Sequence, residues 1–158
     1  MVNIASFFIR WEVYVTNNLS EINDVKSIIS ELLFLIDDAE KQFKKARNWG
    51  FFDMLGGGLI TDLIKHSKLN NASNIMNRIN SLLKDLQREL NEVVIPTDFS
   101  MNTFTFSSFA DFVFDGFLAD TYMQVKIMSS INQIRNLRTQ LLDLQDKMNR
   151  LEGYYRGK

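Results

Sequence analysis

The sequence predicts an all-α protein, an antiparallel bundle of three long amphipathic helices with coiled-coil-like seams. Apolar residues recur at alternating spacings of three and four over three long stretches, which is typical of helices that pack along a seam. The 158 residues include one proline and seven glycines, so little in the chain interrupts a helix. A chain of this length suits a single domain with a sizeable core, and we treat residues 1–158 as one domain.

The N-terminal segment, residues 1–17, is ambiguous. Its apolar residues alternate as they would in a strand. Five residues also share one face of a helix: Ile4, Phe7, Phe8, Trp11 and Val15. We favour a helix that packs on the bundle, because so many aromatic side chains in one short segment require burial.

The first long helix is predicted over residues 19–49. Its seam follows the alternating spacing without a miss: Ile22, Val25, Ile29, Leu32, Ile36, Ala39, Phe43 and Ala46. Asn18 or Ser20 can cap its start by accepting hydrogen bonds from free N–H groups of the first turn. Acidic residues lie early in this helix and basic residues late, as the helix dipole favours.

The second long helix is predicted over residues 71–94. Its apolar face is broad, which indicates contact with two neighbouring helices: Ala72, Ile75, Met76, Ile79, Leu82, Leu83, Leu86, Leu90 and Val93. Pro96 marks its end, because the residue before a proline is biased away from helical geometry.

The third helix is predicted over residues 109–153, and it is the longest. Its seam is again regular: Met123, Ile127, Ser130, Ile134, Leu137, Leu141, Leu144, Met148, Leu151 and Tyr155. A helix of more than forty residues is longer than a compact chain of this size can cover. We therefore expect its C-terminal half to pair with the first helix, with a second copy of the chain, or with both.

The first connection, residues 50–70, contains three consecutive glycines followed by a predicted short helix. A glycine-rich turn before a helix can cradle a phosphate, although a tight corner between helices is the favoured interpretation. The candidate ligand-binding residues here are Trp49, Asp53, Gly56, Gly57, Gly58 and Lys65. Asp62 and His66 share one side of the short helix, where they could bind a metal or simply bond each other.

The second connection, residues 95–108, is rich in β-favouring residues and is predicted to be a short extended segment. After it, Asp111 and Asp115 are helical neighbours of like charge, so a cation or a basic side chain between them would be favourable. The candidate metal ligands are Asp62, His66, Asp111, Asp115 and Asp120. The Glu-x-x-His motifs of di-iron bundles are absent from the sequence. No catalytic residue is assigned and the cofactor stays unknown.

Two segments of this chain resemble those of a group of uncharacterised bacterial all-helical proteins. The first reads W-x-x-x-D-x-x-G-G-G-x-x-T-D-x-x-K-H-S from Trp49 to Ser67, and the second reads F-x-D-x-x-x-D-x-x-x-x-D from Phe109 to Asp120. The resemblance extends around these motifs over residues 45–72 and 109–127, about a third of the chain. It implies an intracellular bacterial helical protein in which the two connections meet, and it implies no activity.

Composition narrows the classes of function. A formal charge of −1 argues against nucleic-acid binding, and the absence of cysteine excludes disulfides and thiolate zinc sites. Residues 121–158 are basic and residues 96–120 acidic, which we interpret as complementarity within the molecule or between subunits. The sequence has no apolar run of membrane-spanning length and no recognisable signal peptide, so we expect a cytoplasmic location.

The favoured function is that of a non-enzymatic helical interaction or scaffold protein acting through its long C-terminal helix. We expect a homo-oligomer, with a dimer favoured, and a protein partner. Tyr154 and Tyr155, beside Arg150 and Arg156, are candidate interface anchors. The alternative is a metal- or small-ligand-binding protein, enzymes included, whose Asp/His site forms where the two connections meet. A regulator at the membrane surface ranks last.

Overall fold

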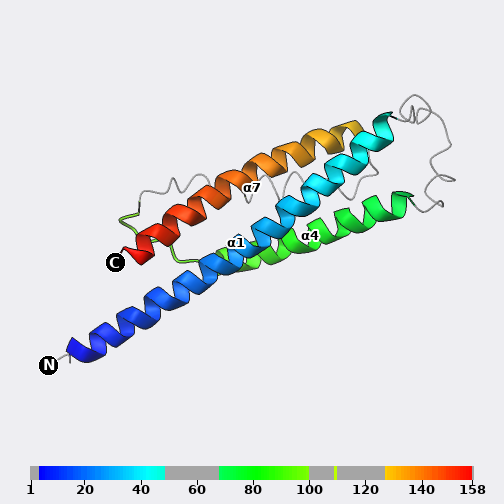
Figure 1. The fold of residues 1–158 in the computed structure, drawn as a ribbon. Coiled ribbons are helices and arrows are strands. Elements are labelled where there is room, and N and C mark those ends of the chain that lie inside the picture. Colours follow the sequence, from blue (N-terminus) through cyan, green and yellow to red (C-terminus); the bar gives the residue numbers. More distant parts are fainter. Residues whose placement is uncertain (1–3, 49–67, 100–108, 110–126, 158) are drawn as a thin grey trace.

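The computed structural model contains three long helices (Figure 1). Helix α1 spans Ile4–Asn48, α4 spans Lys68–Glu92 and α7 spans Ile127–Arg156. The structure describes residues 4–48, 68–99, 109 and 127–157. The predicted all-α class with three long amphipathic helices is confirmed. The predicted short helix after the glycines lies outside the described residues. Of the predicted extended segment over residues 95–108, the described part forms a turn after Pro96 instead, and the rest lies outside the described residues.

Helix α1 is the central helix, and both α4 and α7 pack against it. Arg135, near the start of α7, contacts Glu40, whereas Glu152 near its end contacts Lys26. Residue numbers therefore run in opposite directions along the two helices, and Figure 1 shows the same for α4. Because α4 and α7 are each antiparallel to α1, they run parallel to each other.

The core lies along the seam of α1. Six predicted seam residues of this helix are buried: Ile22, Val25, Ile29, Leu32, Ile36 and Ala39. Helix α4 contributes Ile79, Leu82, Leu83 and Leu86, and Val93 follows directly after its last residue. Helix α7 contributes Ile134, Leu137, Leu141, Leu144, Met148, Leu151 and Tyr155. The alternating spacing therefore identified the buried face of each helix wherever side chains are described.

The N-terminal segment and the first long helix form one continuous helix, and the predicted cap is wrong. Asn18 lies inside α1 and is buried, and its Nδ2 donates to the Tyr14 carbonyl oxygen at 2.8 Å. Ser20 is also an interior residue of this helix. A buried asparagine can satisfy its amide by bonding the preceding helical turn, so the same residue type suits both a cap and a helix interior.

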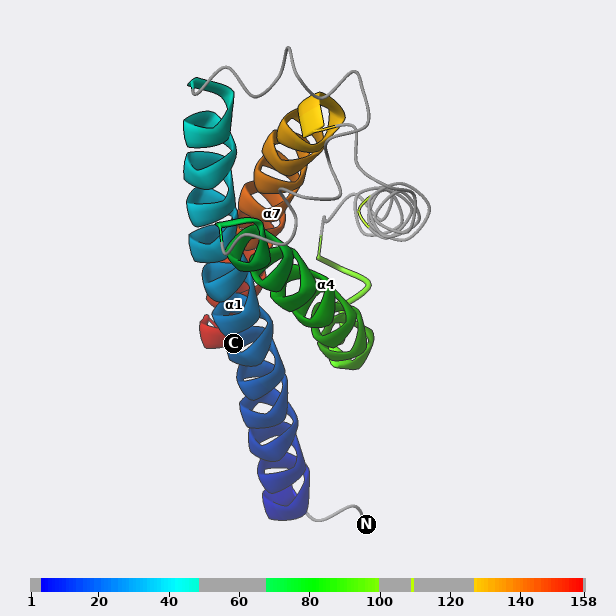
Figure 2. The ribbon, with the colours of Figure 1, turned by 90° about the vertical axis from the view of Figure 1, so that its right-hand side faces the viewer.

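The expectation that the N-terminal aromatic residues are buried is also wrong. Residues 4–15, which we call the arm, extend beyond the ends of α4 and α7 in both views (Figures 1 and 2). Exposed apolar residues of the arm include Ile4, Phe7, Phe8, Ile9 and Val13. The physical reason is length, since α1 has 45 residues while α4 has 25 and α7 has 30.

The helix ends differ from prediction by a few residues. Helix α4 ends at Glu92, and the chain then turns at Pro96, whose carbonyl oxygen accepts from the Phe99 N–H at 3.0 Å. Helix α7 continues past Gly153 to Arg156. Phe109, the predicted start of the third helix, is helical and buried, and residues 110–126 lie outside the described part.

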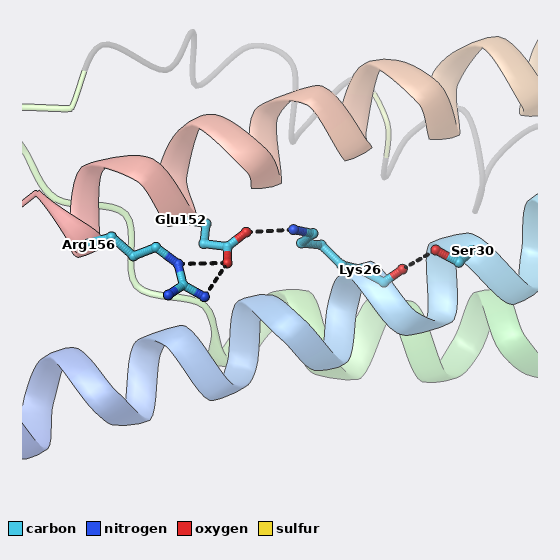
Figure 3. Close-up of polar contacts among 4 residues, drawn as sticks. All are labelled: Lys26, Ser30, Glu152 and Arg156. Carbon is cyan, nitrogen blue, oxygen red and sulfur yellow. Dashed lines mark hydrogen bonds and ion pairs between the residues drawn. The ribbon is translucent and has the colours of Figure 1, made fainter.

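Ion pairs tie α7 to α1 (Figure 3). Glu152 accepts from Lys26 Nζ at 2.5 Å and from Arg156 Nε and Nη2 at 2.9 and 2.7 Å. The hydrogen bonds from Lys26, and then those from Arg156, lower the pKa of Glu152. Further along, Arg135 donates to Glu40 at 2.9 Å. Arg135 of α7 thus pairs with an acidic residue of α1, whereas Glu152 of α7 pairs with a basic one, so ion pairs of both senses join the two helices. The complementarity between residues 96–120 and 121–158 stays a prediction, because residues 100–108 and 110–126 lie outside the described part.

Within the described ranges, none of the helices is both long enough and apolar enough to cross a membrane.

Replacing Leu141 by alanine should lower the free energy of unfolding by about 2–5 kcal/mol, because Leu141 is fully buried in the core. The neighbouring Leu142 is 41% exposed, so its replacement by alanine should change the free energy of unfolding by no more than about 0.5 kcal/mol. Urea unfolding followed by circular dichroism measures both. Equal effects of the two variants would contradict the burial pattern of α7.

Replacing Glu152 by glutamine should lower the free energy of unfolding by about 0.5–1 kcal/mol at neutral pH. Because the pKa of Glu152 is below 4.5 in the folded state, its contribution is present above pH 4.5 and is lost as the pH falls through the folded pKa. The difference between variant and wild type should therefore vanish in acid. Asp146→Asn, which breaks a pair with Arg150 on the same helix, is the control and should have a smaller effect.

Candidate interaction surface

The seam of α1 continues beyond the part that α4 and α7 cover. Counting back from Ile22, the same spacing passes through five further positions: Asn18, Val15, Trp11, Phe8 and Ile4. Asn18 is buried and Val15 is half-buried. The last three are exposed, with Trp11 at 41%, Phe8 at 63% and Ile4 at 72%. The described residues therefore leave the seam uncovered over about two turns at the start of α1, from Ile4 to Trp11.

The arm is apolar on its other faces as well. Phe7, Ile9 and Val13 are exposed, and Arg10 and Glu12 are the only charged residues between positions 4 and 20. A helix that is apolar all round is normally buried. The exposed apolar area of the arm is on the order of 800 Å², which exceeds the largest apolar patch of a typical monomer. The arm therefore has an apolar surface that the described residues leave without cover.

An aromatic cluster joins the base of the arm to the ends of the other helices. The Tyr155 hydroxyl donates to the Val94 carbonyl oxygen at 2.9 Å and lies 3.4 Å from the Tyr14 hydroxyl. Because its only proton serves Val94, Tyr155 accepts from Tyr14. The two rings meet edge to face with centroids 6.2 Å apart. Burial, and then the hydrogen bond with Tyr14, raise the pKa of Tyr155 well above its usual value.

Asp98 is held beside this cluster. The Tyr154 hydroxyl lies 2.6 Å from both carboxylate oxygens of Asp98, and the Phe99 ring packs on Tyr154 with centroids 5.3 Å apart. These contacts fix the turn after α4 against the end of α7. The prediction of Tyr155 as an interface anchor is wrong, because this side chain is buried within its own chain. Tyr154 remains half-buried.

The residues around the cluster form a groove at the base of the arm. It is a half-open depression of about 470 Å³, lined by Trp11, Tyr14, Val94, Ile95, Pro96, Thr97, Asp98, Tyr154 and Tyr155. Among these lining residues Asp98 is the only charged one. Trp11 and Tyr14, whose ring centroids are 5.7 Å apart, belong to the arm itself. The groove thus suits apolar side chains that approach together with a positive charge.

Three carboxylates between α1 and α4 could surround a cation. Glu21, Asp24 and Glu89 each place an oxygen within 4.8 Å of the others. Partial burial, followed by the negative charge of Glu92, raises the pKa of Glu21. Arg88 already donates to Glu89 at 3.0 Å, so it offsets part of the charge that would attract a cation. Exposed acidic groups of this kind are common without a metal.

The residues predicted for a ligand or metal site all lie outside the described residues. These are Trp49, Asp53, Gly56, Gly57, Gly58, Asp62, Lys65, His66, Asp111, Asp115 and Asp120. Whether the two connections meet therefore stays a prediction.

Comparisons with family models, with curated proteins and with solved structures found no match to this chain. The resemblance to a group of bacterial helical proteins likewise stays a prediction.

Sequence reasoning missed the free part of the seam and the groove. The signal for the free seam was present, because the spacing through Ile4, Phe8, Trp11 and Val15 is in phase with that from Ile22 onward. The groove had no comparable signal, since it forms only where the two ends of the bundle and the turn at Pro96 converge.

Replacing Tyr155 by phenylalanine should lower the free energy of unfolding by about 1 kcal/mol, because the buried bond to the Val94 carbonyl is lost while the ring remains. The raised pKa makes the folded state resist ionisation, so the wild type should lose stability as the pH rises above the unfolded pKa of 10.0. The variant should lose less over that range. Unfolding at several alkaline pH values measures this, and Tyr14→Phe, which leaves the Val94 bond intact, is the control.

Proposed function

We propose that this protein is a non-enzymatic interaction or scaffold protein that dimerises through the arm of α1. The observation that supports this most directly is the seam, which continues in phase into the arm and is exposed there. Hydrophobic burial is the main favourable term in protein association. A second apolar helix laid along residues 4–15 would supply for the arm the cover that α4 and α7 supply for the rest of α1.

The proposed surface is the arm and not the C-terminal helix that the sequence indicated. The described seam of α7 is used within the chain, where Ile134, Leu141 and Met148 are fully buried against α1. An exposed apolar residue of α7, Leu142, stands alone and does not continue a stripe. A single exposed leucine is ordinary on a protein surface, whereas the arm exposes several apolar residues together.

The groove supports binding more than catalysis. Its lining offers aromatic rings, two aliphatic side chains, hydroxyl groups and the carboxylate of Asp98. The alternative, an Asp/His metal site with His66 at its centre, rests on residues outside the described part and stays a prediction. The bacterial origin and the cytoplasmic location are likewise predictions.

Replacing Phe8 by serine should raise the dissociation constant of the dimer about a hundredfold or more, because each copy loses a side chain whose burial contributes about 1.5–3 kcal/mol. Light scattering as a function of concentration measures the mass. The melting temperature of the monomer should stay close to that of the wild type, since Phe8 is 63% exposed.

The matched control is Phe34→Ser. Phe34 is 73% exposed on the same helix but lies on the bundle and outside the seam, so this variant should dimerise as the wild type does. A wild type that stays monomeric at all concentrations would exclude the proposed function. Equal weakening by both substitutions would exclude the arm as the interface.

A further inference from the structure

We propose that the groove at the base of the arm receives the N-terminal turn of the arm from a second copy, in a reciprocal antiparallel pair. Each copy then inserts this N-terminal turn, which we call the tip, into the groove of the other copy. This inference rests on the proposed function, because it requires a dimer formed by the arms. It adds the direction of pairing, the register and the receiving site.

The direction follows from the packing of the bundle. Both α4 and α7 are antiparallel to α1, so an antiparallel second arm continues the arrangement that already covers the seam. It also keeps the two bundles at opposite ends of the paired arms. Parallel arms would instead bring the second bundle to the part of α1 where α4 and α7 already lie (Figures 1 and 2).

The register follows from the four seam residues that are not fully buried. An antiparallel pair with its two-fold axis midway along the arm places Ile4 opposite Val15 of the second copy and Phe8 opposite its Trp11. All four positions are then paired in both copies. A shift of one heptad toward the bundle would place Ile4 opposite Ile22, which is already fully buried in its own chain. A shift the other way would leave Trp11 and Val15 without a partner.

This register brings the tip of one arm to the groove of the other. Ile4 and Val15 are separated by about 16 Å along the helix. The tip of the second arm therefore lies level with Val15, next to Tyr14, which lines the groove. The tip presents Ile4, Phe7 and Phe8, and these apolar side chains match the aromatic lining of the groove.

The charges of the two surfaces are complementary. The described first turn of α1 contains no acidic residue, so no carboxylate of that turn would repel Asp98 of a second copy. Asp98 places a carboxylate in the groove, held in position by the Tyr154 hydroxyl. An arriving helix end would thus meet a negative charge, as a helix N-terminus favours.

The arrangement is closed. Each copy has one tip and one groove, so two identical contacts use both and leave neither for a third copy. The exposed apolar area of the arm, on the order of 800 Å² over all its faces, is an upper bound on what a second arm can cover, and an interface of standard size buries about that area on each partner. The contact of each tip with a groove adds to the area that the paired arms bury.

Cross-linking tests the direction and the register, since the chain has no cysteine of its own. Ile4→Cys chains and Val15→Cys chains, carrying tags of different length, are mixed in equal amounts and oxidised gently. We expect cross-links between the two variants to exceed those within either variant by tenfold or more. Circular dichroism of each variant confirms that it is folded. Cross-links mainly within each variant indicate parallel arms and would overturn the inference.

The Asp98→Asn variant tests the groove, because it removes the charge and keeps an oxygen that can accept from Tyr154. We expect the dissociation constant of the dimer to rise threefold to tenfold, while Asp85→Asn, on the exposed face of α4, leaves it unchanged. An unchanged constant for Asp98→Asn would overturn the role of the groove.

Light scattering distinguishes failure of the antiparallel pair alone from failure of the proposed dimerisation. A dimer with the wrong cross-links overturns the antiparallel pair and leaves the proposed function standing. A monomer overturns both, and a monomer that co-sediments with phosphatidylcholine vesicles would assign the arm to a lipid surface instead.

Discussion

Burial of one unbroken apolar line on α1 is the constraint on which the structure depends. The 45 residues of this helix span about 68 Å, whereas the 30 residues of α7 span about 45 Å. Water is excluded from these apolar side chains only where another helix packs on them. The difference in length leaves roughly 20 Å of the same line without cover from the described residues. The seam of the core and the seam of the arm are therefore one continuous stripe of α1, which α4 and α7 cover over one part and leave exposed over the other.

The tyrosine cluster lies at the boundary between these environments. Tyr155 is the last seam residue of α7, and its hydroxyl bonds both to the chain leaving α4 and to Tyr14 of α1. Three parts of the chain are thus held together at the level where cover ends. Asn18, buried one turn further in, donates to the Tyr14 carbonyl oxygen of its own helix. At Asn18 the seam changes from aliphatic residues to a mixed and aromatic series. This change gives the arm a surface different from that of the bundle core.

The sequence was sufficient for the helices and their buried faces, because the spacing of three and four is a local property that each helix repeats many times. It was insufficient for the start of α1, since an asparagine followed by early acidic residues is compatible both with a cap and with a helix interior. It also misled on burial. Aromatic residues do favour burial, but the described residues of α4 and α7 cover α1 only from Val15 onward, so the aromatic side chains nearer its start are exposed among the described residues. The groove could not be predicted, because residues such as Tyr14, Asp98 and Tyr154 meet only in the folded bundle.

The parallel orientation of α4 and α7 has a consequence for folding. Helix α4 meets α1 through residues only 47 positions apart, as in the pair of Arg78 and Glu31, so these two helices can dock early. The contacts of α7 with α1 join residues 95 to 141 positions apart. Most helical bundles fold quickly because their contacts are local. In this bundle the half of the core that contains α7 can form only after the C-terminal part of the chain has been synthesised. At a synthesis rate of about 5–20 residues per second, the side of α1 that faces α7 stays in contact with water for several seconds on the ribosome. During that interval the nascent chain is open to association with any apolar surface, including that of another nascent copy.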